Sequence, residues 1–201
     1  MNKPKLLLAT RNAGKARELK VLLSGIPYDV IMPQDVGITT EVEETGKTLE
    51  ENAALKATML AKKSGLLTLA DDSGLEVDAL GGEPGPLSAR YAGKHATDSQ
   101  RVAYLLERMK DVPQEKRTAQ FHCIIAVASP DGQCKLFEGK CRGIVTLEPK
   151  GELGFGYDPI FLFPQLGKTM AELPMELKNR VSHRGLAAEK ARQYLLKLAG
   201  Q

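Results

Sequence analysis

The sequence contains no tryptophan, and only 5% of its 201 residues are aromatic. It therefore lacks the stacking side chains on which proteins that bind single-stranded nucleic acids depend. No apolar stretch approaches the roughly 20 residues needed to cross a bilayer, and the apolar run Leu6–Ala9 is too short for the core of a secretion signal. Neither a nucleic-acid polymer nor a membrane is expected as a partner.

Cysteine is scarce, and the charge is nearly balanced. Cys123, Cys134 and Cys141 form no C-x-x-C pair, and three cysteines cannot all pair within one chain. This favours free thiols and a cytoplasmic location. The 28 basic and 25 acidic residues give a net charge of +3, which is too small to indicate a general surface for polyanions. A few cations that converge on one small anion remain compatible with it.

Hydrophobic periodicity predicts one domain of the α/β class over residues 1–201. We expect strands at 5–9, 28–32 and 66–74, and helices at 14–24, 48–63, 97–110 and 183–198. The segment 117–148 is typical of two long antiparallel strands around a tight turn, and we expect it to form part of a second lobe.

The segment LATRNAGK (8–15) lies where the first strand gives way to a helix. It fails the Walker pattern, because Ala9 stands at the first glycine position and Ala16 replaces the metal-binding hydroxyl residue. A helix N-terminus still favours an anion, and Gly14 and Lys15 would let backbone and charge approach a phosphate. The alternative is a plain capped turn with a surface lysine. If phosphate binds here, a metal must be held elsewhere.

Two adjacent carboxylates, Asp71 and Asp72, follow an apolar strand. If the strand persists, their side chains point to opposite faces, so that one can serve structure and the other chemistry. Carboxylates together with substrate phosphates suit Mg²⁺, and Glu44, in a loop before a helix, could lie beside Asp72. Asn52 and Lys56, at i and i+4, could point together into a cleft. The alternative is an Asp-Ser-Gly turn.

Two later segments could hold a planar ligand. In GFGYDPIF (154–161), two glycines flank Phe155, which could stack on a base while Asp158 accepts from base N–H groups. The alternative is a tight turn that buries its aromatic residues as core. The segment ELKNRVSHRG (176–185) gathers cations, although such a run is usually a solvated face. These cations are Lys178, Arg180, His183 and Arg184.

Taken in order, these segments resemble one family, the noncanonical purine nucleoside triphosphate pyrophosphatases that act on inosine and xanthosine triphosphates. The resemblance extends from residue 6 to about 198. It rests on T-x-N-x-G-K at 10–15 with Glu18, EETG at 43–46, ENAxxKA at 51–57, ADDSGLEVDALGG at 70–82, PGxxSARYAG up to residue 93, GFGYDPIF, and SHRG at 182–185.

The resemblance implies a mixed, twisted sheet with flanking helices that form two lobes around a central substrate cleft. It implies hydrolysis of ITP, dITP and XTP to the monophosphate and pyrophosphate, with Mg²⁺, by a cytoplasmic homodimer. Asp72 would be general base and metal ligand, Glu44 the second metal ligand, and Lys56 a phosphate-neutralising cation. The implied substrate contacts are Thr10, Arg11, Asn12, Ala13, Gly14, Lys15, Lys56, Ser73, Phe155, Gly156, Tyr157, Asp158, Lys178, His183 and Arg184.

The chemistry of the base suggests how selection would work. Lys178 or Arg184 could donate to the 6-oxo group of hypoxanthine or xanthine, whereas the 6-amino group of adenine would leave those donors unpaired. His183 is the candidate for rejecting the 2-amino group of guanine. Two other functions stay open: a pyrophosphatase for pyrimidine or otherwise modified nucleotides, and a sensor that binds a purine nucleotide without turnover.

Overall fold

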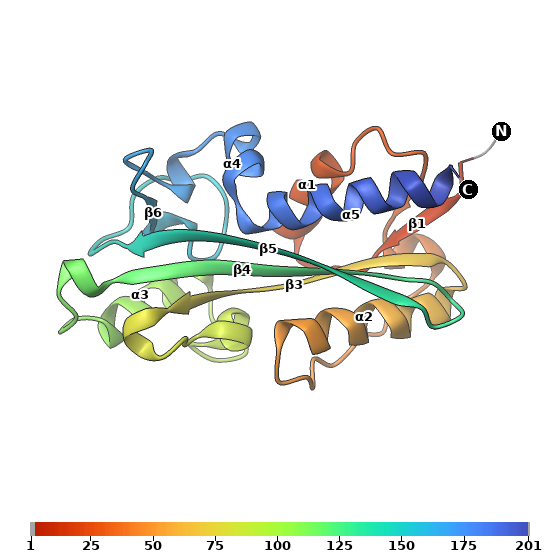
Figure 1. Ribbon diagram of the computed structural model, residues 1–201. Helices are drawn as coiled ribbons and strands as arrows, with labels where there is room; N and C mark the ends of the chain where they lie inside the picture. Colours follow the sequence, from red (N-terminus) through yellow and green to blue (C-terminus); the bar gives the residue numbers. More distant parts are fainter. Residues whose placement is uncertain (1–2, 201) are drawn as a thin grey trace. The chain divides into compact units, whose positions relative to one another are not determined.

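The computed structural model describes residues 3–200. Its strands form a seven-stranded sheet in the order β2-β1-β3-β4-β5-β6-β7, with helices beside the long strands (Figure 1). β1 pairs in parallel with β2 and β3, whereas β6 is antiparallel to β5 and β7. This mixed sheet with flanking helices confirms the α/β class.

Most elements lie close to the bounds expected from periodicity, whereas the short strands β6 and β7 were not expected. The strands are β1 (Lys5–Leu8), β2 (Asp29–Ile31), β3 (Leu67–Val77), β4 (Thr118–Ala128), β5 (Cys134–Val145), β6 (Phe161–Phe163) and β7 (Lys168–Thr169). The α-helices are α1 (Ala13–Leu22), α2 (Leu49–Ser64), α3 (Asp98–Arg108), α4 (Met175–Val181) and α5 (His183–Ala199). Short 3₁₀ turns connect several of them, among them η3 (Gly85–Arg90).

Helix α2 begins and ends as the sequence predicts. Thr48 is its N-cap and accepts from the Glu51 amide at 3.1 Å. Gly65 ends the helix in the left-handed region at φ +70°, which costs a residue without Cβ little. The Glu51 carboxylate accepts from the amide of Lys47, one residue before the cap, at 2.6 Å. Two backbone amides at this end, those of Lys47 and Glu51, are thus bonded to side chains.

Strand β3 corrects one prediction. The strand was expected to break at the two aspartates, but it continues through Asp71, Asp72 and Ser73 to Val77. The Asp-Ser-Gly turn is therefore wrong. A carboxylate inside a buried strand is costly unless it is paired, and Asp71 meets two cations there. Its ion pairs let the strand pass through a position that would otherwise favour a turn.

The described chain divides into two compact units, and strands β3, β4 and β5 each contribute to both. Unit 1 comprises residues 3–72, 123–139 and 184–200, and unit 2 comprises residues 73–122 and 140–183. The segment 117–148, expected in a second lobe, supplies residues to both units. The predicted arrangement of two lobes around a substrate cleft stays a prediction.

Unit 1 has apolar cores on both faces of its strands. Leu6 and Leu8 pack with residues of α1 and α5, whereas Leu7 packs with residues of α2, and Figure 1 shows α5 and α2 on opposite sides of these strands. Successive residues of β3 also alternate between the two faces of the sheet. Leu69 belongs to the α1/α5 core and Ala70 to the α2 core, so Asp71 faces α1 and α5 and Asp72 faces α2.

Unit 2 has one core of its own. Phe121 and Phe161 pack together in it with ring centroids 4.7 Å apart, and Tyr157 is buried in the same core. Helix α3 contributes Val102 and Leu105. Tyr157, Ile160 and Phe161 of the segment GFGYDPIF belong to this core, so the core anchors the C-terminal half of that segment.

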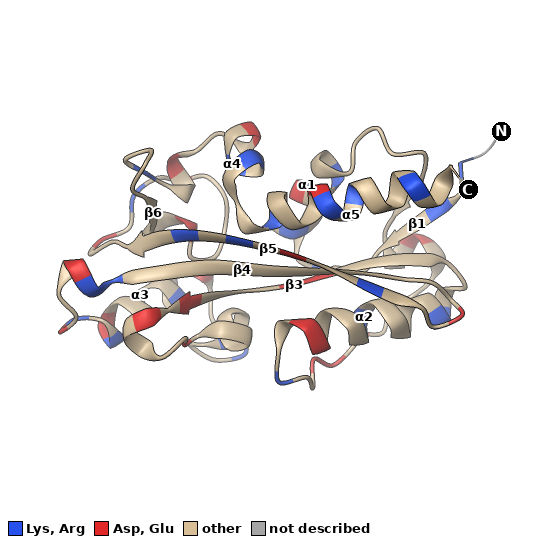
Figure 2. Ribbon diagram, viewed as in Figure 1, with Lys and Arg blue, Asp and Glu red and all other residues tan. Residues whose placement is uncertain are grey.

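Charges are mixed over the surface. Along residues 3–200, basic and acidic residues are interspersed on helices and strands (Figure 2), in agreement with the balanced composition. No helix within this range is both long enough and apolar enough to pass through a lipid bilayer.

Candidate active site

The predicted site residues fall into two sets, one in each unit. Arg184, expected beside His183 in a base pocket, belongs to unit 1 with the phosphate and metal residues. The unit 1 set is Thr10, Arg11, Asn12, Ala13, Gly14, Lys15, Glu44, Lys56, Asp72 and Arg184. The unit 2 set is Ser73, Phe155, Gly156, Tyr157, Asp158, Lys178 and His183.

The corner between β1 and α1 is capped by its own residues. Asn12 is the N-cap of α1: its Oδ1 accepts from the Lys15 amide at 3.0 Å, and its amide donates to Thr10 Oγ1 at 3.2 Å. The Lys15 ammonium does not extend into solvent but lies 3.3 Å from Asp71 Oδ2. The alternative of a surface lysine is therefore wrong. The corner presents a helix N-terminus and a fixed cation, both of which favour an anion.

Arg184 is buried between two carboxylates. Its Nε donates to Asp71 Oδ2 at 3.1 Å, and its Nη1 donates to Glu18 Oε2 at 2.7 Å. All three side chains are at most 4% exposed. Burial alone would lower the pKa of Arg184, but Asp71 and Glu18 outweigh burial and raise it. A buried charge that is paired on both sides is stable in its place, so this part of the site is rigid.

Asp71 is held ionised by the cations around it. Burial would raise its pKa, but the charges of Lys15, Arg184 and Lys56 outweigh burial and hold the pKa at about 2. Asp71 therefore carries a negative charge at every physiological pH. It serves as the counter-ion that keeps Lys15 and Arg184 in place.

On the other face of β3, one ammonium joins two carboxylates. Lys56 Nζ lies 2.7 Å from Glu44 Oε1, 3.1 Å from Asp72 Oδ1 and 2.8 Å from the carbonyl oxygen of Asp71. Burial raises the pKa of Asp72, Glu44 raises it further, and Lys56 and Lys15 oppose this rise. The pKa of Lys56 is raised, because its carboxylate neighbours, Asp72 foremost, outweigh burial. The predicted grouping of Glu44, Lys56 and Asp72 is thus present in the structure.

The loop that carries Glu44 is fastened to α2. Asn52, which is fully buried, accepts from the Gly46 amide through its Oδ1 at 2.8 Å. A Cβ at residue 46 would lie 2.6 Å from that same oxygen, so only glycine fits there. The sequence places Asn52 on the same helix face as Lys56 but does not reveal that its partner is the loop. Asn52 positions Glu44 indirectly, through this loop.

In unit 2, the segment 154–158 closes on itself around Asp158. The Phe155 amide donates to Asp158 Oδ2 at 2.9 Å, and the same oxygen is ion-paired with Lys178. The Lys178 ammonium also lies 4.9 Å from the centroid of the Phe155 ring, within the range of a cation–π contact. Asp158 and Lys178 are each 3% exposed, whereas Phe155 is half-buried. The segment thus presents one aromatic ring above a buried ion pair.

Tyr157 and His183 lie in the interior of unit 2. The Tyr157 hydroxyl donates to the Ser88 carbonyl at 3.0 Å, and burial raises the pKa of this phenol. The His183 ring stacks on Phe121, with centroids 4.5 Å apart and planes 9° apart. The alternative that this turn buries its aromatic residues is correct for Tyr157. Of the predicted cation run, Arg180 is exposed and pairs with Glu176, whereas Lys178, His183 and Arg184 are buried, so a solvated face is wrong for these three.

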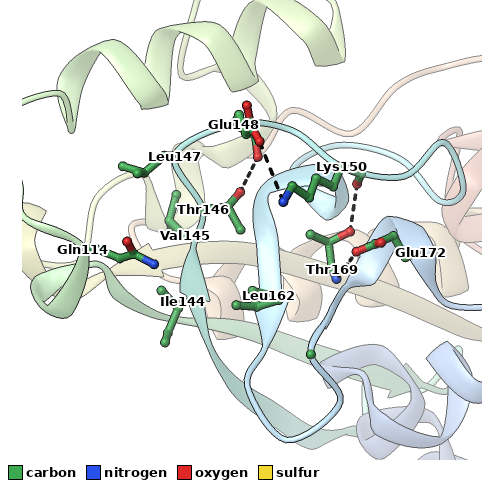
Figure 3. A pocket seen from close by; sticks show the side chains of 11 residues that line it. Gln114, Ile144, Val145, Thr146, Leu147, Glu148, Lys150, Leu162, Thr169 and Glu172 are labelled. Carbon is green, nitrogen blue, oxygen red and sulfur yellow. Dashed lines mark hydrogen bonds and ion pairs between the residues drawn. The ribbon is translucent and has the colours of Figure 1, made fainter.

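A separate hollow of about 650 Å³ also lies within unit 2 (Figure 3). Apolar side chains, among them Ile144 and Leu162, line it together with an ion pair in which Lys150 Nζ lies 3.7 Å from Glu148 Oε1. None of the predicted site residues lines it. The two carboxylates in its lining are both bonded to protein groups, Glu148 to Lys150 and Glu172 to the Thr169 amide, so we do not place the chemistry there.

Comparison with known proteins identifies the family of the chain. A family model described as the Ham1 family matches residues 6–194. The chain belongs to the Ham1 family. It is 50% identical over 191 residues to a dITP/XTP pyrophosphatase of Geobacter sulfurreducens, with 95% of this chain and 96% of the relative covered. It is 46% identical to the dITP/XTP pyrophosphatase of Bacillus subtilis over 94% of this chain and 96% of that one.

Solved structures of the Ham1 family share the fold. A HAM1 protein from Coxiella burnetii superposes with a TM-score of 0.88 at 40% identity, covering 96% of this chain and 99% of that chain. The Ham1 protein of Staphylococcus aureus gives a TM-score of 0.86 at 42% identity with the same coverage. The family expected from the ordered motifs is therefore confirmed, as is its fold.

Sequence reasoning missed some residues that hold this Ham1-family site together. Glu18 is part of the first motif, yet its role as partner of Arg184 is not evident from spacing, because 166 positions separate the two residues. Its position three residues after Lys15 on α1 was the only available signal. Phe121, the residue on which His183 stacks, lies in an apolar strand. The sequence of this strand predicts only that Phe121 is part of the core.

Proposed function

We propose that the protein hydrolyses the noncanonical purine triphosphates ITP, dITP and XTP to the nucleoside monophosphate and pyrophosphate. The observation that carries this proposal is the single ammonium of Lys56 between the carboxylates of Glu44 and Asp72. A site that only bound a nucleotide would need cations, not two carboxylates next to them. Relatives at 46–50% identity named dITP/XTP pyrophosphatase support the choice of substrate.

We propose Mg²⁺ as the cofactor, held by Glu44 and Asp72. The donor set suits this ion, because Mg²⁺ prefers carboxylate oxygens together with substrate phosphates. Within residues 3–200, Asp72 Oδ2 is buried and has no hydrogen-bond partner, which is costly unless something else binds this oxygen. Bound there, the ion would neutralise phosphate charge and lower the pKa of a water molecule.

The remaining chemistry belongs to side chains of the protein. In this proposal Asp72 orients the attacking water and accepts its proton as the oxygen–phosphorus bond forms, and pyrophosphate leaves with the electrons of the broken bond. Lys15 and Lys56 neutralise the phosphate oxygens as negative charge builds in the transition state. Because Asp71, itself fixed by Arg184, holds Lys15 in place, little reorganisation is needed during the reaction.

For the base, we propose that Phe155 stacks on the purine and that Lys178 donates to its 6-oxo group. A purine with a 6-amino group would instead direct an N–H donor at the Lys178 ammonium, which has no lone pair to accept it, so adenine is disfavoured. Asp158, which is ion-paired with Lys178, keeps that ammonium beside the Phe155 ring.

The experiment is a product analysis with Mg²⁺ and, separately, ITP, XTP, GTP and ATP. Pyrophosphate with IMP or XMP, and little turnover of GTP or ATP, is the expected result. Release of single phosphates would show that a different bond is cleaved. In Asp72→Asn, turnover should fall by about 10³-fold or more while ITP binding survives. If wild type turns over none of the four substrates, the result favours the two alternatives, a pyrophosphatase for pyrimidine or otherwise modified nucleotides and a nucleotide sensor.

We further propose that the protein is a cytoplasmic homodimer. The family resemblance supports the dimer, and sedimentation equilibrium tests it through the mass in solution. The free thiols of Cys123, Cys134 and Cys141 support a reducing compartment. Burial raises the pKa of Cys123 and of Cys141 to about 12, so these two thiols stay protonated and unreactive at neutral pH.

A further inference from the structure

The segment PGxxSARYAG, quoted above for the family resemblance, has no role in the proposed chemistry, but it is bonded to the base-recognition loop (residues 154–158). Ser88, in η3, accepts the Tyr157 hydroxyl at its carbonyl oxygen at 3.0 Å. The Ser88 hydroxyl in turn accepts from the Leu75 amide at 2.9 Å and donates to the Gly85 carbonyl at 2.6 Å. All these residues belong to unit 2. One end of the loop is thus fixed to a buried, internally bonded turn.

The middle of the loop is fixed by a second residue, Asp98, in the first turn of α3. Asp98 Oδ2 accepts from the Gly156 amide at 2.7 Å. Gly156 has φ +63°, a left-handed conformation that directs this amide in a way few residues other than glycine allow. A carboxylate acceptor makes such a bond roughly twice as strong as a neutral one. Asp98 therefore selects the conformation in which Phe155 and Lys178 meet.

Asp98 is itself held in position. Its other carboxylate oxygen is paired with Arg101, one helical turn later. The Arg101 guanidinium also donates to the carbonyl oxygens of Ala89, at 3.1 Å, and Ala96. It thereby joins α3 to η3, the turn that holds Tyr157. The two attachments of the loop, through Asp98 and through Ser88, form one connected network.

We propose that Asp98 is a positioning residue that sets the affinity of the enzyme for the purine base through the Gly156 amide. This rests on the proposed function, which gives the 154–158 loop its role in base binding. Both side-chain partners of Asp98, Gly156 and Arg101, lie in unit 2. The carboxylates and lysines that act on the phosphates lie in unit 1. Loss of Asp98 should therefore weaken base binding and leave the phosphate chemistry intact.

The test compares wild type with Asp98→Ala, Asp98→Asn and the control Glu107→Ala. Glu107 lies on the same helix, is exposed, and pairs with Lys110. We expect Asp98→Ala to raise KM for ITP about tenfold, the usual loss for one charge-assisted hydrogen bond, with kcat within about twofold. The KM of Asp98→Asn should lie between those of wild type and Asp98→Ala, because its amide oxygen still accepts from the Gly156 amide but its side chain no longer forms an ion pair with Arg101. Glu107→Ala should match wild type.

Inorganic tripolyphosphate, which has no base, is the probe that separates positioning from general damage. Its inhibition constant against ITP should be the same in wild type and in Asp98→Ala. If tripolyphosphate binding weakens as much as ITP binding, or if KM for ITP is unchanged in the variants, the proposal is overturned. Should Asp98→Ala fail to fold, Asp98→Asn decides by the same comparison.

Failure of the proposed function would be visible separately. If wild type releases no pyrophosphate from ITP, the binding of IMP is measured by calorimetry in wild type, Asp98→Asn and Glu107→Ala. A loss of IMP affinity in Asp98→Asn alone supports the positioning role. Equal affinity in all three proteins, or no IMP binding to any of them, overturns it.

Discussion

The replacement Asp71→Asn should destabilise the protein at neutral pH and lose this effect in acid. The ordinary pKa of this carboxyl is 3.8, and its three cations hold it at about 2 in the folded protein. One pKa unit corresponds to about 1.4 kcal/mol, so the ionised form contributes about 2.5 kcal/mol to folding at pH 7. Solvent does not screen these ion pairs appreciably, because Asp71 is only 2% exposed.

The sign of the pH dependence follows from the direction of the shift. Because the folded pKa is lowered, the stabilisation is complete above about pH 4 and is lost as the pH falls toward 2. The asparagine side chain of the variant cannot titrate, so the difference in unfolding free energy between wild type and Asp71→Asn should shrink over this window. Urea unfolding at pH 7 and at several values between 4 and 2.5, with EDTA present, measures it.

Asp111→Asn is the matched control, since Asp111 is exposed. Its unfolding free energy should stay within about 0.5 kcal/mol of wild type at each pH. If Asp71→Asn lowers the unfolding free energy equally at pH 7 and pH 3, the shape of the side chain and not its charge determines stability at this position. No loss at pH 7 would refute the account of Asp71 as counter-ion to Lys15 and Arg184.

Three further predictions concern catalysis and selectivity. Lys56→Gln should lower kcat by about 10²-fold or more, because the variant lacks the ammonium that is proposed to neutralise phosphate charge in the transition state. Unchanged single-turnover rates would exclude this role. Gly46→Ala would bring a Cβ to 2.6 Å from Asn52 Oδ1, so the loop that carries Glu44 must shift. The Mg²⁺ concentration for half-maximal rate should then rise about tenfold. If the variant needs the same Mg²⁺ concentration as wild type, the loop does not position Glu44. His183→Ala removes the ring stacked on Phe121 and should narrow the ratio of kcat/KM for ITP over GTP, and an unchanged ratio would exclude His183 as the residue that rejects guanine.

Much of the fold was predictable because its local signals are strong and agree with one another. Helix α2 carries its N-cap, its apolar face and its terminal glycine within 18 consecutive residues, Thr48 to Gly65. The path of β3 was not predictable in the same way. Whether a strand continues through Asp71 and Asp72 depends on cations supplied by α1, α2 and α5, and a window around residue 70 contains none of them.

The candidate site was predictable in its residues more than in their contacts. The ordered motifs named Asp72, Glu44 and Lys56, and the structure brings these three together. The motifs did not separate residues that touch a ligand from residues that hold others. Arg184 looks like a donor for the base, but two of its nitrogen atoms are bonded to Asp71 and Glu18. Such pairings join distant parts of the chain and follow only from the fold.

The two adjacent aspartates show how one strand separates structure from chemistry. Both are buried, yet cations lower the pKa of Asp71, whereas burial and Glu44 raise that of Asp72. The difference arises from strand geometry, because neighbouring side chains face opposite sides of the sheet. Asp71 meets Arg184 on one face and is fixed as an anion. Asp72 meets Lys56 on the other, beside a second carboxylate, which suits its proposed role as base. A shift of β3 by one residue would exchange these environments and move the proposed base away from Lys56 and Glu44.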